Sequence, residues 1–378
     1  MKKIYVNQSK VSYRAKRYVD EVMNSNWIGL GKKVEEFEEK FADYCDAKYC
    51  IGTNSATSAI HLSLIISQLS GCDIYTTPIT FVSVNNSILH INGRPIFCDI
   101  NRKTGNVDKS SIEKVIENYS NSGIILTHYA GNLIDEVTMN YVLKMFGSDK
   151  VINDYSHCAG AKYGSGYKLI NSDFNIFSFH AVKNISTPDG GAIVTDNKEV
   201  YDLARKLRWY GIDKSTYERE NNGYNWKYDV SELGYKYHMN DITAAFCLAG
   251  LEELDGNNAY RFYIMNKYIK YLNKSISMIP FTKNSSCHMA VVKLPESIVR
   301  DEFLSKLAEI YEIYCGVHYY PNNRYSLFAF YDNNETTNAD YFFDRIISLP
   351  CHLSMFEIDI DRVINSVNEL IEKESYKN

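Results

Sequence analysis

The sequence predicts an α/β protein with a mainly parallel central sheet, followed by a smaller α+β region. Between about residue 50 and residue 200, short apolar runs alternate with stretches of helical periodicity, a pattern typical of repeated strand–helix–strand units. The chain has 378 residues, of which 45% are hydrophobic and 23% charged, as in ordinary globular proteins. Because a single core usually divides beyond roughly 250 residues, we expect two domains, residues 1–255 and 256–378.

The first domain is expected to contain strands and helices in alternation. Each strand is a short apolar run, and each helix is a longer stretch in which apolar residues recur at helical spacing. The expected strands are residues 73–77, 95–99, 123–127, 151–154, 175–178 and 192–195. The expected helices are residues 57–69, 82–91, 110–117, 135–146 and 199–210. Right-handed crossovers would place these helices on both faces of one sheet.

The pattern changes after residue 210. The stretch GIDKSTYERENNGYNWKYD, residues 211–229, is too long and too charged for a core, so we expect a surface excursion, either a lid or a dimer arm. Residues 240–254 then predict an apolar helix, and residues 257–272 a long amphipathic one that leads into the second domain. That domain is expected to have strands near 288–294 and 314–318 and helices near 301–310 and 359–372.

Charge and hydropathy exclude several classes of partner. Lys and Arg total 41 against 46 for Asp and Glu, a net charge of −5, and no basic block occurs, so we expect no nucleic acid partner. The first residues, MKKIYVNQSK, lack the apolar stretch of a signal peptide. No run approaches the roughly 18 apolar residues that span a bilayer. We therefore expect a cytoplasmic protein without a membrane partner.

The cysteines and the glycine motifs exclude further sites. Nine cysteines are scattered without any CxxC pair, which predicts reduced thiols and no metal site. The nearest candidate for a metal site, Cys351-His352, has no second pair of ligands. The chain also lacks GxGxxG and GxxxxGK[ST], so a dinucleotide-binding or P-loop protein is not indicated.

Candidate chemistry lies where ligands collect in open α/β sheets, beyond the carboxyl ends of the strands. In GTNSATSAIHL, residues 52–62, Ser55 and Thr57 lead into an apolar helix, as either a simple N-cap or a phosphate site. In VINDYSHCAGA, residues 151–161, Asp154 ends an apolar strand and His157 follows three residues later. This carboxylate either caps the next turn or meets a cationic or protonated group.

Two further segments complete the set. Most lysines are solvated surface charges, but Lys183 lies between two apolar strands, and a partly buried lysine can have a pKa low enough to form a Schiff base. Phe81, in ITFVSV, is either a core residue or a stacking partner for a planar ring. An aromatic face, a helix start for a phosphate, a strand-end carboxylate and a lysine on a turn after a strand are together what a pyridoxal 5'-phosphate (PLP) site requires.

Ordered motifs extend this set along nearly the whole chain. They occupy residues 27–31, 34–38, 54–59, 78–81, 95–99, 128–132, 154–157, 178–184, 189–191, 234–245 and 348–350. In order and spacing they resemble the DegT-type nucleotide-sugar aminotransferases, a branch of the fold-type I PLP enzymes. The resemblance implies a large PLP-binding domain, with a seven-stranded, mainly parallel sheet flanked by helices, and a smaller C-terminal α+β domain.

The resemblance also implies roles for individual residues. Lys183 would bind the cofactor covalently and shuttle a proton, Asp154 would pair with the pyridine nitrogen, and His157 would lie against the ring or its hydroxyl. The residues implied for cofactor binding are Ala56, Thr57, Phe81, Asp154, His157, Ser178, Lys183 and Lys236. Those implied for the substrate are Trp27, Gly29, His180, His318 and Tyr319.

The family's active sites are completed by a second subunit, which implies a homodimer with shared active sites. Lys236 would reach across the interface. Many members have asparagine at this position and arginine at that of His238. Lysine is nonetheless chemically suited to a phosphate.

The activity that the resemblance implies is transfer of an amino group from L-glutamate to a nucleotide-linked 4-keto-6-deoxysugar. Position C4 is favoured over C3, and the product would be an amino sugar for surface polysaccharide. One alternative is a PLP-dependent sugar dehydratase of the same family, but these enzymes carry histidine in place of the Schiff-base lysine, and His180 lies three residues from that position. The other alternative is a non-catalytic regulator that binds PLP or a sugar nucleotide.

Overall fold

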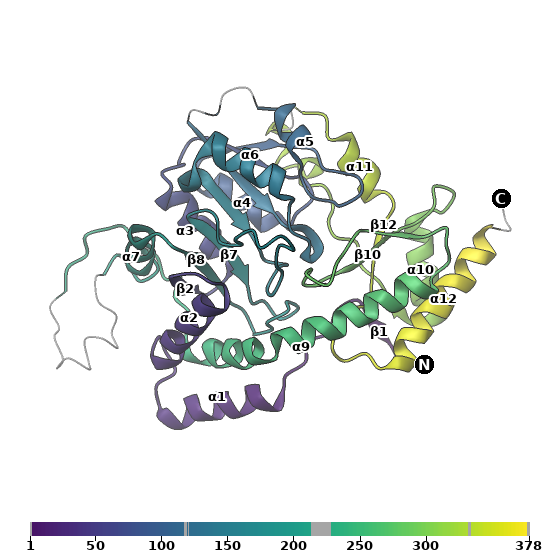
Figure 1. The fold of residues 1–378 in the computed structure, drawn as a ribbon, viewed down its shortest axis with the longest axis horizontal. Helices are drawn as coiled ribbons and strands as arrows, with labels where there is room; N and C mark the ends of the chain where they lie inside the picture. Colours follow the sequence, from purple (N-terminus) through teal and green to yellow (C-terminus); the bar gives the residue numbers. More distant parts are fainter. Residues whose placement is uncertain (1, 117–118, 120, 213–227, 332–333, 376–378) are drawn as a thin grey trace.

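A seven-stranded sheet forms the centre of the protein (Figure 1). The computed structural model describes residues 2–116, 119, 121–212, 228–331 and 334–375. The strands, in sheet order, are β2 (Tyr49–Thr53), β8 (Gly191–Thr195), β7 (Phe174–Ser178), β6 (Val151–Asp154), β5 (Ser122–Thr127), β3 (Asp73–Thr76) and β4 (Arg94–Phe97). Among the described strands of this sheet, only β8 runs opposite to the others. The predicted fold class, α/β with a mainly parallel sheet, is confirmed.

Helices cover both faces of this sheet, because successive strand residues point to opposite sides. Ile176 of β7 packs with α3 (Ala56–Ile66), α4 (Val82–His90) and α7 (Lys198–Leu207). The next residue, Phe177, packs with α2 (Lys32–Tyr44) and the long helix α9 (Asp241–Tyr271) on the other face. The helices α5 (Lys109–Glu113) and α6 (Glu136–Phe146) continue that second face. The central strands are buried throughout, as expected for a sheet covered on both sides.

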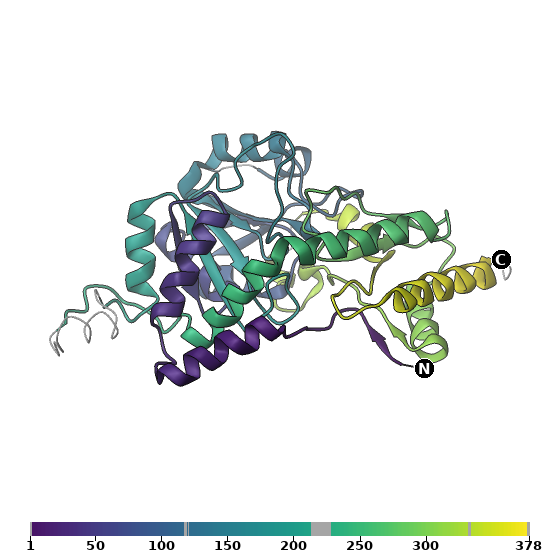
Figure 2. The ribbon, with the colours of Figure 1, turned by 60° about the horizontal axis from the view of Figure 1, so that its bottom comes forward.

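The helix α9 is continuous, whereas the sequence had predicted two helices, residues 240–254 and 257–272; this expectation is wrong. Figure 2 follows the helix along its length, from the sheet to the C-terminal region. Gly256 lies inside it, at a cost of only about 1 kcal/mol relative to alanine. Leu254 and Asn258, on either side of this glycine, are buried. Their packing holds the helix against the large core and offsets the cost of the glycine.

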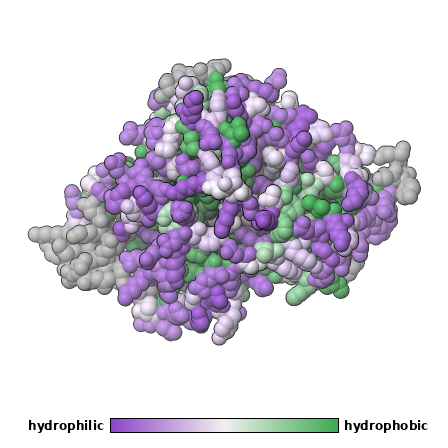
Figure 3. Space-filling model, in the orientation of Figure 1, coloured by the Kyte–Doolittle hydropathy of each residue, from purple (hydrophilic) through white to green (hydrophobic). Residues whose placement is uncertain are grey.

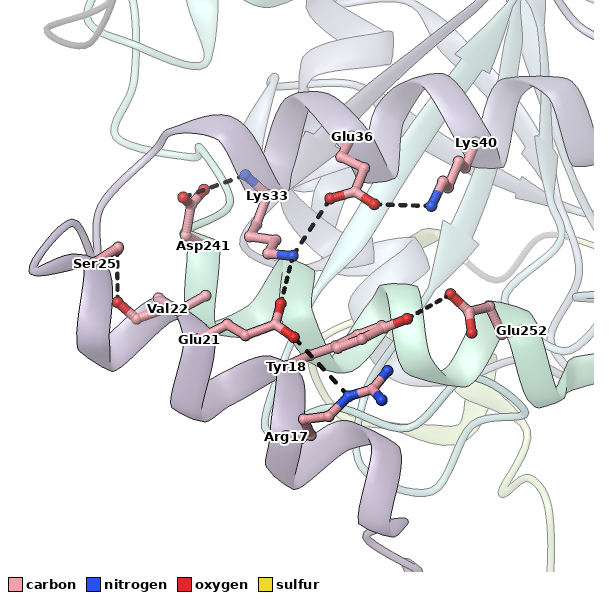
Figure 4. Close-up of polar contacts among 10 residues, drawn as sticks. All are labelled: Arg17, Tyr18, Glu21, Val22, Ser25, Lys33, Glu36, Lys40, Asp241 and Glu252. Carbon is pink, nitrogen blue, oxygen red and sulfur yellow. Dashed lines mark hydrogen bonds and ion pairs between the residues drawn. The ribbon is translucent and has the colours of Figure 1, made fainter.

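The N-terminal helices α1 (Tyr13–Ser25) and α2 pack against the first half of α9 (Figure 4). The Asp241 carboxylate accepts hydrogen bonds from the main-chain N–H groups of Gly31 at 2.9 Å and Val34 at 3.1 Å. It thereby joins the start of α9 to the start of α2. The Tyr18 hydroxyl donates to Glu252 at 2.8 Å, which ties α1 to the same helix.

The C-terminal region has its own core. The strands β12 (Ile346–Leu349), β10 (Ala290–Lys293) and β9 (Ser277–Met278) form an antiparallel sheet, packed with α10 (Arg300–Tyr311), α11 (Thr337–Phe343) and α12 (Glu357–Ser375). The strand β1 (Ile4–Tyr5) pairs with β11 (Ile313–Tyr314), so Ile4 belongs to this core. Short 3-10 turns occupy Tyr129–Gly131, Ser148–Lys150, Asn322–Arg324 and Ala329–Tyr331. The domain boundary at 255/256 stays a prediction.

Other local expectations need correction. Strand β2 was not foreseen, α5 ends at Glu113, and β11 ends at Tyr314, with one isolated bridge at Gly316. Residues 213–227 of the predicted surface excursion lie outside the described residues. All nine cysteines are free, and all but Cys315 are buried.

The surface fits the ordinary composition of the chain. Figure 3 shows hydrophilic residues over most of the visible face, with hydrophobic residues in smaller patches between them. Among the helices that the structure describes, none combines the length and the apolar character needed to span a bilayer.

Candidate active site

A cavity of about 340 Å³ opens at the carboxyl edge of the central sheet. Asp154 ends β6, Ser178 ends β7, and the loop between β7 and β8 carries Lys183. The sequence-predicted residues that line the cavity are Ala56, Thr57, Phe81, Asp154, His157, Ser178, His180, Lys183, His318 and Tyr319. Local sequence could place them at strand ends, and the parallel arrangement brings those ends together.

Lys183 lies in a hydrogen-bonded loop. The Phe179 N–H donates to Gly190 O at 2.9 Å, and the Thr187 N–H donates to Phe179 O at 2.9 Å, so the loop is closed at its base. The Lys183 side chain is half-buried and lines the cavity. This burial lowers the Lys183 pKa from 10.5 to about 8, although the nearby Asp154 carboxylate opposes the change. At pH 7 roughly a tenth of the amine is therefore uncharged and nucleophilic, far more than for an ordinary lysine.

Asp154 is 3% exposed. Its Oδ1 accepts a hydrogen bond from the Ser156 main-chain N–H at 3.0 Å. Burial nevertheless raises the Asp154 pKa above its ordinary value, because hydrogen bonds and the Lys183 charge offset only part of the lost solvation. A protonated ring nitrogen placed against this carboxylate would supply the missing positive charge, so the residue fits the pyridine end of PLP.

An aromatic wall faces the same cavity. The His157 Nε2 lies 3.1 Å from the Tyr319 hydroxyl, and the two rings stack with centroids 6.0 Å apart. Phe81 meets Tyr319 edge to face at 6.0 Å and is 58% exposed. Burial holds the His157 pKa well below its ordinary value, so this imidazole is neutral. Since the Ala130 N–H donates to its Nδ1 at 3.3 Å, the ring proton sits on Nε2 and points to Tyr319.

The N-terminus of α3 forms another wall. The Ser55 hydroxyl caps the helix by accepting from the Ser58 N–H at 3.1 Å. The N–H groups at Ala56 and Thr57, in the first turn, have no partner within the helix and favour an anion. Gly191 makes this arrangement possible, because a Cβ there would lie 2.4 Å from the Ala56 nitrogen. Together with Ser178, this corner fits a phosphate.

Three predicted residues lie away from the cavity. Trp27 and Gly29 line a separate apolar hollow of about 340 Å³, together with Trp209 and His238. Lys236 is exposed, and its carbonyl accepts from the Asn54 side chain at 3.2 Å. The role assigned to Lys236 depends on a second subunit, and the roles of all three residues stay predictions.

Sequence reasoning missed the residue that anchors the aromatic wall. Asn322 is 1% exposed and lies in the segment that carries Tyr319. Its N–H donates to Pro78 O at 2.9 Å, its Nδ2 donates to Thr80 O at 2.9 Å, and its Oδ1 accepts from Asn85 Nδ2 at 2.9 Å. These bonds fix the segment beside Phe81. No local pattern signals a contact between residues more than 230 positions apart.

A mainly parallel α/β sheet that carries a half-buried lysine, a buried carboxylate and a helix N-terminus at its carboxyl edge fits a PLP-dependent enzyme of fold-type I. Comparison with known proteins gives the family. The chain belongs to the DegT/DnrJ/EryC1/StrS aminotransferase family, whose model matches residues 10–368. The family and the aminotransferase activity predicted from the sequence are confirmed.

Relatives of known sequence and structure cover almost the full chain. A UDP-4-amino-4,6-dideoxy-N-acetyl-beta-L-altrosamine transaminase of Campylobacter jejuni is 33% identical over 97% of this chain and 96% of its own. The spore coat polysaccharide biosynthesis protein SpsC of Bacillus subtilis is 30% identical over 93% of each chain. The structure of Helicobacter pylori PseC, an aminotransferase involved in the biosynthesis of pseudoaminic acid, superposes with a TM-score of 0.88 at 27% identity, over 98% of this chain and 100% of that one.

Proposed function

We propose that this enzyme uses PLP to transfer an amino group from L-glutamate to C4 of a nucleotide-linked 4-keto-6-deoxysugar. One observation carries the proposal: Lys183, whose pKa is lowered to about 8, shares a cavity with the buried Asp154 carboxylate and the N-terminus of α3. The lysine and the carboxylate suit the two ends of a pyridine ring, and the helix start suits a phosphate. PLP bound in this cavity would supply an electron sink for the bonds at the amino-bearing carbon.

The residues of the chain have separate tasks in this scheme. The N–H groups of Ala56 and Thr57 and the Ser178 hydroxyl hold the phosphate, and Asp154 keeps a positive charge on the ring nitrogen. The neutral His157 and the exposed face of Phe81 bound the space for the ring. These contacts orient the reacting carbon toward the lysine.

Lys183 has two tasks in sequence. When PLP is bound, its amine would hold the cofactor covalently. The free amine then carries a proton from the donor's Cα. A pKa of about 8 is close to the operating pH, which favours a group that must both accept and return a proton.

The names of the relatives support the choice of acceptor. The C. jejuni relative is called a transaminase of a UDP-4-amino-4,6-dideoxy sugar, which places its amino group at C4 of a nucleotide-linked deoxysugar. SpsC is named for spore coat polysaccharide biosynthesis. We extend both features to this chain, with a product destined for surface polysaccharide.

The proposed working form is a homodimer in the cytoplasm. His180, His318 and Tyr319 line the cavity from within the chain and would contact the sugar. Lys236 would reach the active site of the partner, and Trp27 and Gly29 stay predicted contacts of the substrate.

The cofactor and the donor are tested together by mixing the purified, PLP-loaded protein with L-glutamate. The yellow colour of the lysine-bound cofactor should fade within one half-reaction. Lys183→Ala should abolish this change and release the cofactor on gel filtration, whereas the exposed Lys283→Ala should behave as the wild type. Persistent colour with glutamate in the wild type would favour the non-catalytic regulator.

The acceptor is tested with a panel of UDP-, dTDP- and GDP-linked 4-keto-6-deoxysugars, assayed with glutamate. The expected product carries a new amine at C4, detected by mass spectrometry, with 2-oxoglutarate as the second product. Amination at C3 would overturn the position. Loss of a hydroxyl without a new amine would favour the dehydratase.

A further inference from the structure

Residues 286–288, which precede β10 in the C-terminal region, lie directly behind the active site. His288 is 2% exposed and Ser286 is fully buried. The segment contacts both loops that carry the proposed chemistry, the Lys183 loop and the loop of Asp154 and His157. It does not line the cavity, so any influence on the reaction must act through those loops.

The contact with the lysine loop is made by Asn184, the residue after Lys183. The Asn184 Nδ2 donates to Asn258 Oδ1 at 2.6 Å and to Ser286 O at 2.8 Å. Both of its protons are therefore used, and its Oδ1 can only accept. Since the His288 Nδ1 lies 2.9 Å from that oxygen, the imidazole must carry its proton on Nδ1 and donate it. All three side-chain hydrogen bonds of Asn184 are made with residues outside its own loop.

The contact with the second loop is made by the same segment. The His288 ring stacks on the His157 ring with centroids 4.8 Å apart and planes inclined by 26°. The Ser286 hydroxyl donates to the His157 carbonyl. One face of His157 is therefore fixed by His288, while its Nε2 meets Tyr319 at 3.1 Å. The segment thus sets the place of the lysine and of His157 relative to each other.

We propose that His288 is a positioning residue that holds Lys183 in its reactive place by donating a hydrogen bond to Asn184. The inference rests on the proposed function and deepens it. Lys183 follows the strand β7 by five residues, and the side chain of its neighbour Asn184 anchors the loop to α9 and to the C-terminal region. Without the His288 donor, a buried acceptor on Asn184 loses its partner, and the loop must move to satisfy it with water.

Two substitutions separate the two contacts of His288. His288→Asn keeps an N–H donor on the atom that corresponds to Nδ1 but removes the ring. His288→Phe keeps a ring against His157 but removes the donor. His352→Phe is the matched control, because His352 is also a buried histidine of the C-terminal region and does not line the cavity.

Each PLP-loaded variant is reduced with borohydride, and the fraction of cofactor that remains attached after denaturation is measured by mass spectrometry. The first-order rate of the half-reaction at saturating glutamate and the melting temperature are measured beside it. We expect His288→Phe to show a lower attached fraction and a half-reaction slowed by roughly tenfold to 100-fold, because a misplacement of about 1 Å can cost on the order of 100-fold. His288→Asn and His352→Phe should stay within about threefold of the wild type in rate.

Equal loss in His288→Phe and His288→Asn, or wild-type behaviour of His288→Phe, would overturn the inference. If His288→Phe does not fold, Asn184→Ala provides the test, since it removes the acceptor together with the bonds to Asn258 and Ser286 and should give at least the same loss. If both fold, the double variant should be no worse than Asn184→Ala alone, because that variant already lacks the bond to His288. Failure of the wild type to attach PLP would instead overturn the proposed function, and the two failures are thereby distinguished.

Discussion

The low pKa of Lys183 makes the stability of the cofactor-free protein depend on pH. An ordinary lysine has a pKa of 10.5, and burial lowers that of Lys183 to about 8. The unfolded chain therefore binds more protons than the folded chain between about pH 8 and pH 10.5, so the contribution of this residue to stability rises with pH across that window. Lys183→Met removes the titrating amine and keeps an unbranched chain.

The magnitude follows from the two pKa values. Their difference corresponds to a roughly 300-fold lower proton affinity in the folded state. The lower proton affinity of Lys183 in the folded state therefore reduces the free energy of unfolding by about 3 kcal/mol at pH 7 and by about 1 kcal/mol at pH 9.5. Any constant gain from burying the methionine cancels when the two pH values are compared. From pH 7 to pH 9.5, we expect the free energy of unfolding of the wild type to rise by about 2 kcal/mol relative to that of Lys183→Met.

The assay is urea unfolding of both cofactor-free proteins at pH 7 and pH 9.5, at one protein concentration. Other groups that titrate in this range occur in both proteins and cancel in the difference. Lys283→Met, at an exposed site, should show no pH-dependent difference from the wild type. A wild-type minus Lys183→Met difference that is the same at both pH values would refute the argument that burial lowers the pKa of this lysine.

Outcomes are also expected for four further variants. Asp154→Asn should lower kcat of the holoenzyme by roughly tenfold to 100-fold in steady-state assays, because a hydrogen bond to a charged group contributes about 1.5–3 kcal/mol; unchanged kcat would contradict its role at the ring nitrogen. Gly191→Ala should destabilise the protein by about 1–3 kcal/mol and weaken PLP binding, measured by urea unfolding and cofactor titration, because its Cβ would lie 2.4 Å from the Ala56 nitrogen. Gly256→Ala, with nothing within 4 Å, should instead stabilise the protein by about 0.5–1 kcal/mol. Asn322→Ala removes the side-chain donor of Thr80 O and the acceptor for one of the two Asn85 Nδ2 protons. An unmade buried hydrogen bond costs about 1–3 kcal/mol, so calorimetry should show a lower Tm; an unchanged Tm would contradict the network.

Much of the active site could be predicted from the sequence because its parts lie at the ends of strands. Asp154 and Ser178 end apolar runs, and the parallel order of those runs brings their carboxyl ends to one edge. Lys183 was distinguished by its place between two such runs. These features depend on local periodicity, which each short segment displays without reference to the rest of the chain.

The packing behind the site could not be predicted in this way. His288 and Asn322 carry no distinctive local signal, and their partners lie 104 and 237 positions away. The continuity of α9 could not be predicted either, because a glycine at position 256 favours a helix end. Only the burial of the residues on both sides of it shows that the helix continues. Trp27 and Gly29 were grouped with the substrate residues, yet they line a different hollow.

The sequence by itself determined the layered α/β architecture and which strand-end side chains meet at the carboxyl edge of the sheet, since apolar runs and helical periodicity are local features. Only the tertiary structure decided how the lysine loop is held and how its amine loses solvation. Both effects arise from hydrogen bonds and burial between segments distant in the chain, and their strength depends on the distances and the exclusion of water that packing alone sets.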